Sequence, residues 1–373
     1  MKYYLVAGEA SGDLHGANLM KALKTLDKDA EFRFFGGDLM QAEGGIVVKH
    51  IADMAFMGFM EVVLNLNTIM NNLKLCKADI TAWQPNVLVL IDFPGFNLKI
   101  ADFAKKSGLL VCYYISPKVW AWNQKRVLKI KRVVDHLFCI LPFEVDFYKT
   151  WGMEVDYVGN PLLDAVSAFS PAANFLADNQ LTGKKIIALL PGSRRQEISR
   201  LLPAMVSVTE QFQDHQFVVA GAPSFSAEYY TPFLNQKNIP IVFNATYDLL
   251  SHADAAIVAS GTATLETALF NVPQVVVYKG HPVSIAIARS VVTIKFISLV
   301  NLIMDSPVVK ELIQQDASPK NIAAELDSLV NNTDYRAKML ANYDELDVRM
   351  GKPGASAKTA GLIIKYVKER ASH

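Results

Sequence analysis

The sequence places an aspartate where a general base for a hydroxyl group would be expected. Asp92 directly follows the apolar run Val87–Ile91, in the stretch IDFPGFN, and hydrophobic residues flank it. Because limited hydration raises the pKa of a carboxyl group, such a side chain accepts an alcohol proton better than an exposed aspartate does. An aspartate at a strand end also often caps the next loop. The residues alone leave both interpretations open.

Two further stretches have the composition of anion-binding loops. PGSRR, at 191–195, and ASGT, at 259–262, each follow an apolar run and precede a helical pattern. Backbone amides at a helix start favour phosphate, and an arginine adds a charge-assisted hydrogen bond. Ordinary helix capping with solvated arginines is the alternative, but two such loops in one half of the chain favour a nucleotide. The expected diphosphate ligands are Gly192, Ser193, Arg194, Ser260, Gly261 and Thr262.

A carboxylate follows the second of these loops. Glu266 lies one helical turn beyond ASGT, where it could accept hydrogen bonds from both ribose hydroxyls of a nucleotide. A surface glutamate without a ligand is the alternative interpretation.

The stretch YYISPKVWAWNQKRV, at 113–127, mixes aromatic and basic residues. Tryptophan can stack on a sugar, and lysine or arginine can bind phosphate. The candidates are Lys118, Trp120, Trp122, Lys125 and Arg126. Such mixtures also occur in proteins that bind single-stranded nucleic acid. The chain has 37 basic and 36 acidic residues, however, so its charge does not support a nucleic-acid partner.

The loop GEASGD, at 8–13, differs from a dinucleotide-binding loop. It lacks the GxGxxG pattern, and its Glu9 and Asp13 would repel a diphosphate. We expect this loop to face a hydroxyl-bearing partner or to orient other groups.

A dense apolar segment spans residues 57–73. Its large side chains recur at helical spacing, opposite Glu61, Asn65, Thr68 and Asn72. The pattern alone favours a helix that faces the core, although further apolar residues outside the stripe also suit a surface that dips into a membrane. The stripe comprises Phe59, Val62, Val63, Leu66, Ile69, Met70 and Leu73.

Composition excludes several other classes of protein. Half of the 373 residues are hydrophobic, yet no run of about 18 apolar residues is long enough to span a membrane. Cys76, Cys112 and Cys139 lie among apolar residues without a CxxC pair, so we expect buried, reduced thiols and a cytoplasmic location. No metal-ligand spacing of histidines or cysteines occurs, and we expect neither a metal nor a cofactor.

The candidate loops need parallel strands to position them. Short β-branched apolar runs alternate with longer helix-period stretches, which predicts an α/β protein with doubly wound parallel sheets and ligands beyond the carboxyl ends of the strands. A polar interruption near 165–183 divides the series into two halves with a cleft between them. The expected strands are Tyr3–Ala7, Val87–Ile91, Leu110–Tyr114, Ile186–Leu190, Phe217–Ala220, Ala256–Val258 and Gln274–Tyr278.

The motifs, in their order, resemble the lipid-A-disaccharide synthase family from residue 3 to about residue 330. The resemblance is carried by GEASGDLHGA, MGFMEVV, IDFPGFNL, YYISPKVWAWNQKRV, LPFE, LLPGSRRQEI, ASGTATLE and SLVNLI…VVKELIQ. It implies the GT-B glycosyltransferase architecture of two Rossmann-like domains. We then expect an acceptor- and membrane-facing domain at 1–168, a UDP-sugar domain at 169–350, and a final helix at 351–373 packing back on the first domain.

The resemblance also implies a reaction. UDP-2,3-diacylglucosamine donates its sugar to the 6-hydroxyl of 2,3-diacylglucosamine 1-phosphate, with inversion and without metal, giving a β-1,6-linked disaccharide and UDP. Such an enzyme works at the inner face of the cytoplasmic membrane as a peripheral protein, and a homodimer is possible. Both substrates carry acyl chains, so the resemblance turns our expectation for the 57–73 stripe from core to membrane surface.

Residue by residue, Asp92 matches the family's candidate catalytic base. Glu9 and Asp13 match its acidic amino-terminal loop, and Asn301, in SLVNLI, matches an active-site asparagine. Arg194 and Glu266 match the diphosphate-loop arginine and the nucleotide-contacting acid. Two positions depart from the pattern: Gly95 stands where some members have an acidic residue, and Val300 where proline is common.

Two alternatives stay open at this point. Another GT-B enzyme, such as a UDP-N-acetylglucosamine epimerase or a related transferase, would share the nucleotide loops but would need neither the apolar stripe nor the SPKVWAW segment. A non-catalytic module that binds a nucleotide sugar or lipid would need no Asp92.

Overall fold

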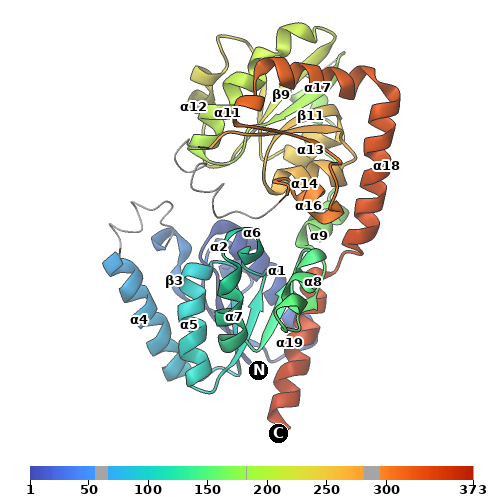
Figure 1. The fold of residues 1–373 in the computed structure, drawn as a ribbon. Helices are drawn as coiled ribbons and strands as arrows, with labels where there is room; N and C mark the ends of the chain where they lie inside the picture. The colour runs from blue at the N-terminus through green and yellow to red at the C-terminus, as the bar shows by residue number, and fades with distance from the viewer. Residues whose placement is uncertain (55–65, 182, 281–294, 373) are drawn as a thin grey trace. The chain divides into compact units, whose positions relative to one another are not determined.

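The computed structural model describes residues 1–54, 66–181, 183–280 and 295–372 (Figure 1). The chain divides into two compact units. The first comprises residues 1–161 and 352–373, and the second comprises residues 162–351. Each unit is an α/β layer structure with a parallel sheet of its own.

The sheet of the first unit has the strand order β3-β2-β1-β4-β5-β6-β7, and all its neighbouring strands pair in parallel. Its inner strands are continuous apolar runs because helices cover both faces; every residue of β4 is fully buried. The strands are β1 (Lys2–Val6), β2 (Glu31–Gly36), β3 (Ile46–His50), β4 (Val87–Ile91), β5 (Leu110–Tyr114), β6 (His136–Cys139) and β7 (Asp156–Tyr157).

Two layers of helices cover this sheet. One hydrophobic core lies under α4, α5, α7 and α8, and another lies under α1, α2 and α19. The helices are α1 (Ala10–Leu26), α2 (Asp38–Ala42), α4 (Leu66–Trp83), α5 (Pro94–Lys106), α6 (Val119–Trp122), α7 (Val127–Val133), α8 (Phe143–Thr150) and α19 (Ala355–Ala371).

The carboxyl-terminal helix α19 belongs to the first unit and packs against α1 (Figure 1). The Tyr366 ring stacks on His136 with ring centroids 3.4 Å apart, and its hydroxyl donates to Asp156. Ile363, also in α19, is fully buried. Stacking and burial therefore hold this last segment to the β6–β7 side of the sheet.

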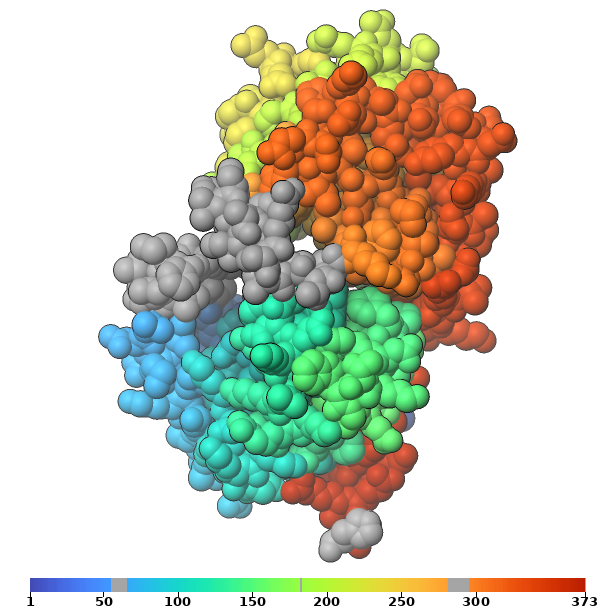
Figure 2. All heavy atoms as spheres, viewed as in Figure 1, coloured from blue at the N-terminus to red at the C-terminus, as the bar shows by residue number. Residues whose placement is uncertain are grey.

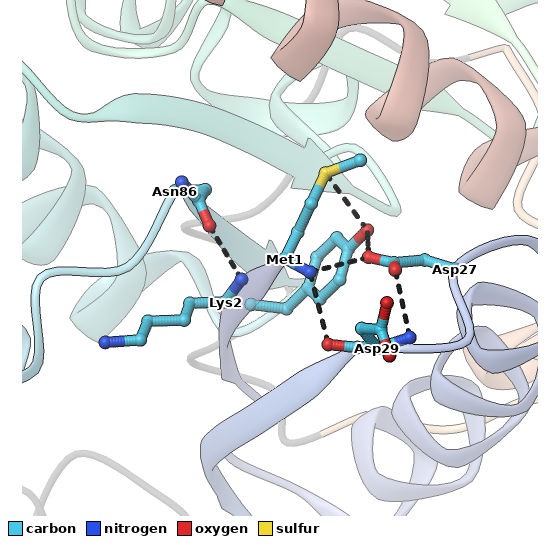
Figure 3. Close-up of polar contacts among 6 residues, drawn as sticks. Met1, Lys2, Asp27, Asp29 and Asn86 are labelled. Carbon is cyan, nitrogen blue, oxygen red and sulfur yellow. Dashed lines mark hydrogen bonds and ion pairs between the residues drawn. The ribbon is translucent and has the colours of Figure 1, made fainter.

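The start of β1 is fixed by polar contacts. The Met1 amino group and the Tyr3 hydroxyl both donate to the Asp27 carboxylate over 2.9 Å, and the Lys2 amide donates to the side chain of Asn86 (Figure 3). These contacts tie β1 to the end of α1 and to the segment before β4, the strand that pairs with β1.

The second unit has the strand order β10-β9-β8-β11-β12-β13, also with parallel pairs. Its strands are β8 (Lys185–Leu190), β9 (His215–Gly221), β10 (Ile241–Phe243), β11 (Ala253–Ala259), β12 (Gln274–Tyr278) and β13 (Lys310–Ile313). Its helices are α9 (Pro161–Ala168), α10 (Phe175–Asp178), α11 (Arg195–Ser207), α12 (Ala227–Tyr230), α13 (Thr246–Ser251), α14 (Thr262–Leu269), α16 (Leu299–Met304), α17 (Pro319–Asn331) and α18 (Thr333–Met350).

Each sheet reverses its strand order once. In the first unit the chain runs outward from β1 to β3 and then returns to β4 on the other side of β1; in the second unit β8 and β11 stand in the same relation. Loops that leave such a neighbouring pair diverge, and ligands bind there. The pairs lead into GEASGD and IDFPGF in one unit, and into PGSRR and ASGT in the other. All four loops had been predicted as sites.

The structure confirms the α/β class, the doubly wound parallel sheets and the buried state of Cys76, Cys112 and Cys139. Among the described residues, no helix is long and apolar enough to cross a bilayer.

The apolar stripe divides in the structure. Its residues 57–65, with Val62 and Val63, lie outside the described residues, and the rest opens α4, which lies on the surface of the first unit (Figure 2). Leu66 and Met70 are exposed at 52% and 49%, whereas Leu73 is buried at 4% and Ile69 packs against the same core. Leu73 was therefore wrongly expected on a membrane surface. Asn72, expected on the polar face, is also buried.

Helical spacing could not reveal this division. It indicated that Leu66, Ile69, Met70 and Leu73 share one broad face, but α4 turns only part of that face inward.

Candidate active site

Asp92 lies at the reversal point of the first sheet in a strained backbone conformation. It and Phe93 have φ angles of 44° and 48°, in the left-handed region that residues with side chains rarely adopt. Each such residue costs on the order of 1–3 kcal/mol, so surrounding contacts must hold it. The left-handed conformation at Asp92 and Phe93 ends the extended backbone of β4.

The Asn97 side chain supplies several of these contacts. Its fully buried side-chain amide donates to the carbonyl oxygens of Val6, Ile91 and Asp92 over 3.3, 3.2 and 2.7 Å. The Tyr113 hydroxyl, from β5, donates to the same Asp92 carbonyl. One amide thus joins the carboxyl ends of β1 and β4 at the base of the proposed site. Asn97 was missed from the sequence because an asparagine in the first turn of a helix looks like an ordinary polar residue.

Gly8 is required by the same arrangement. A Cβ atom at this position would lie 2.2 Å from the Phe93 ring. Only glycine lets the loop after β1 pass the ring. The two loops at the reversal point can therefore pack closely because residue 8 has no side chain.

The electrostatics of Asp92 suit a base. Burial raises the pKa of its carboxyl group, nearby Lys118 lowers it, Glu9 raises it, and the Phe93 amide lowers it. Glu9 and Lys118 are exposed side chains. The structure therefore brings together three predicted site residues, Asp92, Glu9 and Lys118, from the loops after β4, β1 and β5.

Asp13 differs from this expectation. It is 4% exposed, and its carboxylate accepts backbone N–H groups from Gly37, Leu39 and Met40 over 2.7, 3.0 and 3.0 Å. A Cβ atom on Gly37 would meet one carboxylate oxygen at 2.6 Å. Asp13 is thus a buried anchor for the loop after β2, and both of its carboxylate oxygens accept backbone amides.

Trp120 also differs from its predicted role. It is 7% exposed, its indole N–H donates to Glu144, and its ring meets Phe143 edge to face. It cannot stack on a sugar. Trp122, by contrast, is 49% exposed, with the Arg126 guanidinium 4.9 Å from its ring centroid. Lys125 is exposed as well, so the basic candidates remain accessible.

In the second unit, the loop after β8 already holds an anion. One oxygen of the Glu197 carboxylate accepts the Ser193 and Arg194 amides over 3.1 and 3.2 Å, and the other accepts the Arg194 guanidinium over 3.1 Å. Gly192, at φ 99°, leaves room for this carboxylate, which a Cβ atom would approach to 2.4 Å. The groups predicted to bind diphosphate therefore form a nest, and in this structure the nest binds the Glu197 carboxylate.

The loop after β11 presents Gly261 and Thr262, both exposed, at the start of α14. The Ser260 hydroxyl is engaged, since it donates to the Ile297 carbonyl over 2.9 Å. One turn further, Glu266 accepts the Tyr247 hydroxyl over 2.8 Å, and burial raises its pKa while this hydrogen bond lowers it. Tyr247 uses one carboxylate oxygen and orients the group.

Asn301 is buried rather than open to substrate. It is 1% exposed; its amide donates to the Val309 carbonyl and to Glu311, and its oxygen accepts the Val309 amide. Glu311 also accepts the Ile297 and Ser298 amides and the Ser298 hydroxyl. Asn301 was expected among the catalytic residues, and the structure places it in this buried network. It braces the segment whose Ile297 carbonyl holds Ser260.

Within the described residues, no group of three or more histidine, cysteine, aspartate or glutamate side chains could hold a metal ion.

Comparison with known proteins first defines the class. Solved structures with a similar fold over nearly the whole chain include a UDP co-structure from S. aureus (TM-score 0.68, 13% identity, 100% of this chain and 97% of that one). Another is the UDP-GlcNAc 2-epimerase from Neisseria meningitidis bound to UDP-GlcNAc (TM-score 0.67, 11% identity, 99% and 100%). Two Rossmann-like units of this topology define a protein of the GT-B class.

The sequence then places the chain within that class. A model of the lipid-A-disaccharide synthetase family matches residues 3–360. The lipid-A-disaccharide synthase of Trichlorobacter lovleyi is 39% identical over 98% of this chain and 97% of its own length. That of Coxiella burnetii is 37% identical over 96% of each. The chain belongs to the lipid-A-disaccharide synthase family, and it is a glycosyltransferase of lipid A biosynthesis. An epimerase or a non-catalytic binding module is not favoured.

Proposed function

We propose that the chain transfers 2,3-diacylglucosamine from UDP-2,3-diacylglucosamine to the 6-hydroxyl of 2,3-diacylglucosamine 1-phosphate, with inversion. The products are the β-1,6-linked disaccharide 1-phosphate and UDP. The observation that carries this proposal is the Asp92 carboxylate, which is partly buried, has a raised pKa and is held in a strained conformation at the reversal point of the first sheet.

Asp92 is the general base in this mechanism. As the 6-oxygen of the acceptor attacks the anomeric carbon of the donor, its proton passes to the Asp92 carboxylate and the bond from the anomeric carbon to the phosphate oxygen breaks. Burial and Glu9 make the carboxylate more basic, whereas Lys118 keeps a fraction of it ionised. We assign Lys118, with Lys125 and Arg126, to the phosphate of the acceptor.

The second unit receives the leaving diphosphate. Charge develops on the phosphate oxygens as the bond breaks, and preorganised donors stabilise that charge. We assign this role to Arg194, the amides of the loop after β8, and the start of α14 at Gly261 and Thr262. Glu266 binds the ribose hydroxyls with the carboxylate that Tyr247 orients.

A nucleotide at this nest must compete with Glu197. The Glu197 carboxylate occupies the two amides and the guanidinium that we assign to phosphate. Diphosphate offers more charge to the same donors than a carboxylate does, so donor binding releases Arg194 from Glu197. Release of UDP restores the internal ion pair.

We further propose that the start of α4 contacts the inner face of the cytoplasmic membrane. Leu66 and Met70 stand exposed one helical turn apart, and both substrates carry acyl chains that remain in the bilayer. Insertion of apolar side chains at the headgroup boundary lowers the free energy, because it removes apolar surface from water.

Asp92→Asn tests the proposed base. The amide keeps the size of the side chain but cannot accept the hydroxyl proton, so acceptor-dependent UDP release should fall about 10²- to 10⁴-fold. UDP release from UDP-2,3-diacylglucosamine is measured with and without 2,3-diacylglucosamine 1-phosphate, and UDP affinity serves as the control for folding. A variant that binds UDP normally and turns over at the wild-type rate would remove Asp92 from the mechanism.

Arg194→Ala and Glu197→Gln should change UDP affinity in opposite directions. Loss of the guanidinium weakens UDP binding or transition-state stabilisation by about 2–4 kcal/mol. Loss of the competing charge at Glu197 should strengthen UDP binding, as calorimetry would show. Arg195→Ala is the matched control, because the Arg195 guanidinium lies over the Phe225 and Tyr229 rings instead. Equal effects of the two arginine variants would contradict the assignment.

Leu66→Ser with Met70→Ser should reduce binding to anionic vesicles without loss of thermal stability. Leu73→Ser, in the same helix, is the control, since a buried leucine lost from the core should lower stability by about 2–5 kcal/mol. Vesicle co-sedimentation and thermal melting separate the two effects. Unchanged sedimentation of the double variant would contradict a membrane role for this surface.

A further inference from the structure

The LPFE motif contains a buried carboxylate that the proposed chemistry does not use. Glu144, in the first turn of α8, is 1% exposed. One of its oxygens accepts the Trp120 indole N–H over 3.1 Å, and the other accepts the Ile140 and Leu141 amides over 3.2 and 3.0 Å. Burial raises the pKa of Glu144 to about 7, opposed by these hydrogen bonds. A carboxyl group buried at such cost needs its partners, and an apolar residue would often serve stability equally well.

Glu144 joins the loops that leave two neighbouring strands. Ile140 and Leu141 follow β6, and Trp120 lies in α6, which follows β5. A second contact runs parallel to the first, since the Ser116 and Tyr148 hydroxyls lie 2.8 Å apart and connect the end of β5 to the middle of α8. The segment after β5 is therefore fixed to α8 at two points, residues 116 and 120.

Lys118 lies between those two points. Pro117 and Val119 on either side are buried, whereas Lys118 is exposed and close enough to Asp92 to lower its pKa. A lysine side chain is long and flexible, so only a fixed backbone keeps its ammonium group near one place. The two anchors give the backbone of Lys118 that fixed position.

We propose that Glu144 is a positioning residue for the acceptor half of the reaction, because through Trp120 it fixes the segment that holds Lys118 beside Asp92. The inference rests on the proposed function, in which Lys118 binds the phosphate of the acceptor. It also explains why the LPFE and SPKVWAW stretches occur together in this chain: the carboxylate of one is the partner of the indole of the other.

The test is a double-mutant cycle between Glu144→Gln and Lys118→Ala. Glutamine offers one carbonyl oxygen to the indole but turns an amide group toward the Ile140 and Leu141 amides, so one set of contacts is lost. We expect the KM for 2,3-diacylglucosamine 1-phosphate to rise about 10- to 100-fold in Glu144→Gln, with the KM for the UDP donor unchanged. Lys118→Ala should raise the acceptor KM as well, and add little in the Glu144→Gln background.

Two further variants make the result decisive. Glu154→Gln, an exposed glutamate in the segment that follows α8, is the matched control and should leave both KM values unchanged. Trp120→Phe keeps the ring on Phe143 but removes the N–H donor, and it enters the same cycle if Glu144→Gln fails to fold.

Additive effects of the two substitutions on the acceptor KM would overturn the proposal, and so would an equal rise in the KM values for donor and acceptor. A residue that only supports the fold gives either result. An unchanged acceptor KM in Lys118→Ala would overturn the proposal too. Neither result affects the assignment of Asp92 as base, which depends on turnover by Asp92→Asn.

Discussion

The Asn97 side-chain amide is the interaction on which the acceptor half of the site depends. It is the buried donor shared by the carbonyls at the ends of β1 and β4, the two strands between which the sheet reverses its order. With that amide in place, Asp92 and Phe93 adopt left-handed conformations, the Phe93 ring covers Gly8, and Glu9 lies on the neighbouring loop. The position and basicity of Asp92 both follow from this local arrangement, because the same packing that strains its backbone also limits its hydration.

A common device fixes the loops around the sites in both units. Loops at the carboxyl ends of parallel strands carry backbone amides that the sheet does not use, and these amides take other acceptors. Asp13, Glu144, Glu197 and Glu311 each collect two or more such amides. Several residues that look catalytic by type are thus structural acceptors, and we assign the chemistry instead to Asp92 and Glu266. Glu197 stands between the two groups, since it fills a nest that we assign to phosphate.

The sequence was sufficient for the fold and for the loops that carry the site, but not for the role of each side chain. Buried parallel strands are continuous apolar runs, so strands such as Val87–Ile91 could be predicted in place, and the rule that ligands bind at their carboxyl ends located all four loops. What Trp120, Asp13 and Asn301 do could not be predicted, because each has a partner that is distant or undistinguished in the sequence: Glu144, the amides after β2, and Glu311. A carboxylate that accepts backbone amides and one that accepts a substrate proton belong to the same residue type, so the sequence does not distinguish them. Packing likewise determines which side of α4 faces the core. The pattern of apolar residues defines the rotation of this helix about its axis only to within a fraction of a turn.

The pH dependence of kcat tests most directly whether Asp92 is the base that works between Glu9 and Lys118. Because burial and Glu9 raise its pKa, turnover at saturating substrates should fall as the pH drops through that raised value, where the protonated carboxyl can no longer accept the hydroxyl proton. Glu9→Gln removes a negative charge and should move this acid limb to lower pH; Lys118→Ala removes a positive charge and should move it to higher pH. The assignment of Asp92 as base predicts opposite shifts of the limb in the two variants. A limb at the same pH in the wild type and in both variants would contradict it, and would show that the group which takes the proton is not Asp92.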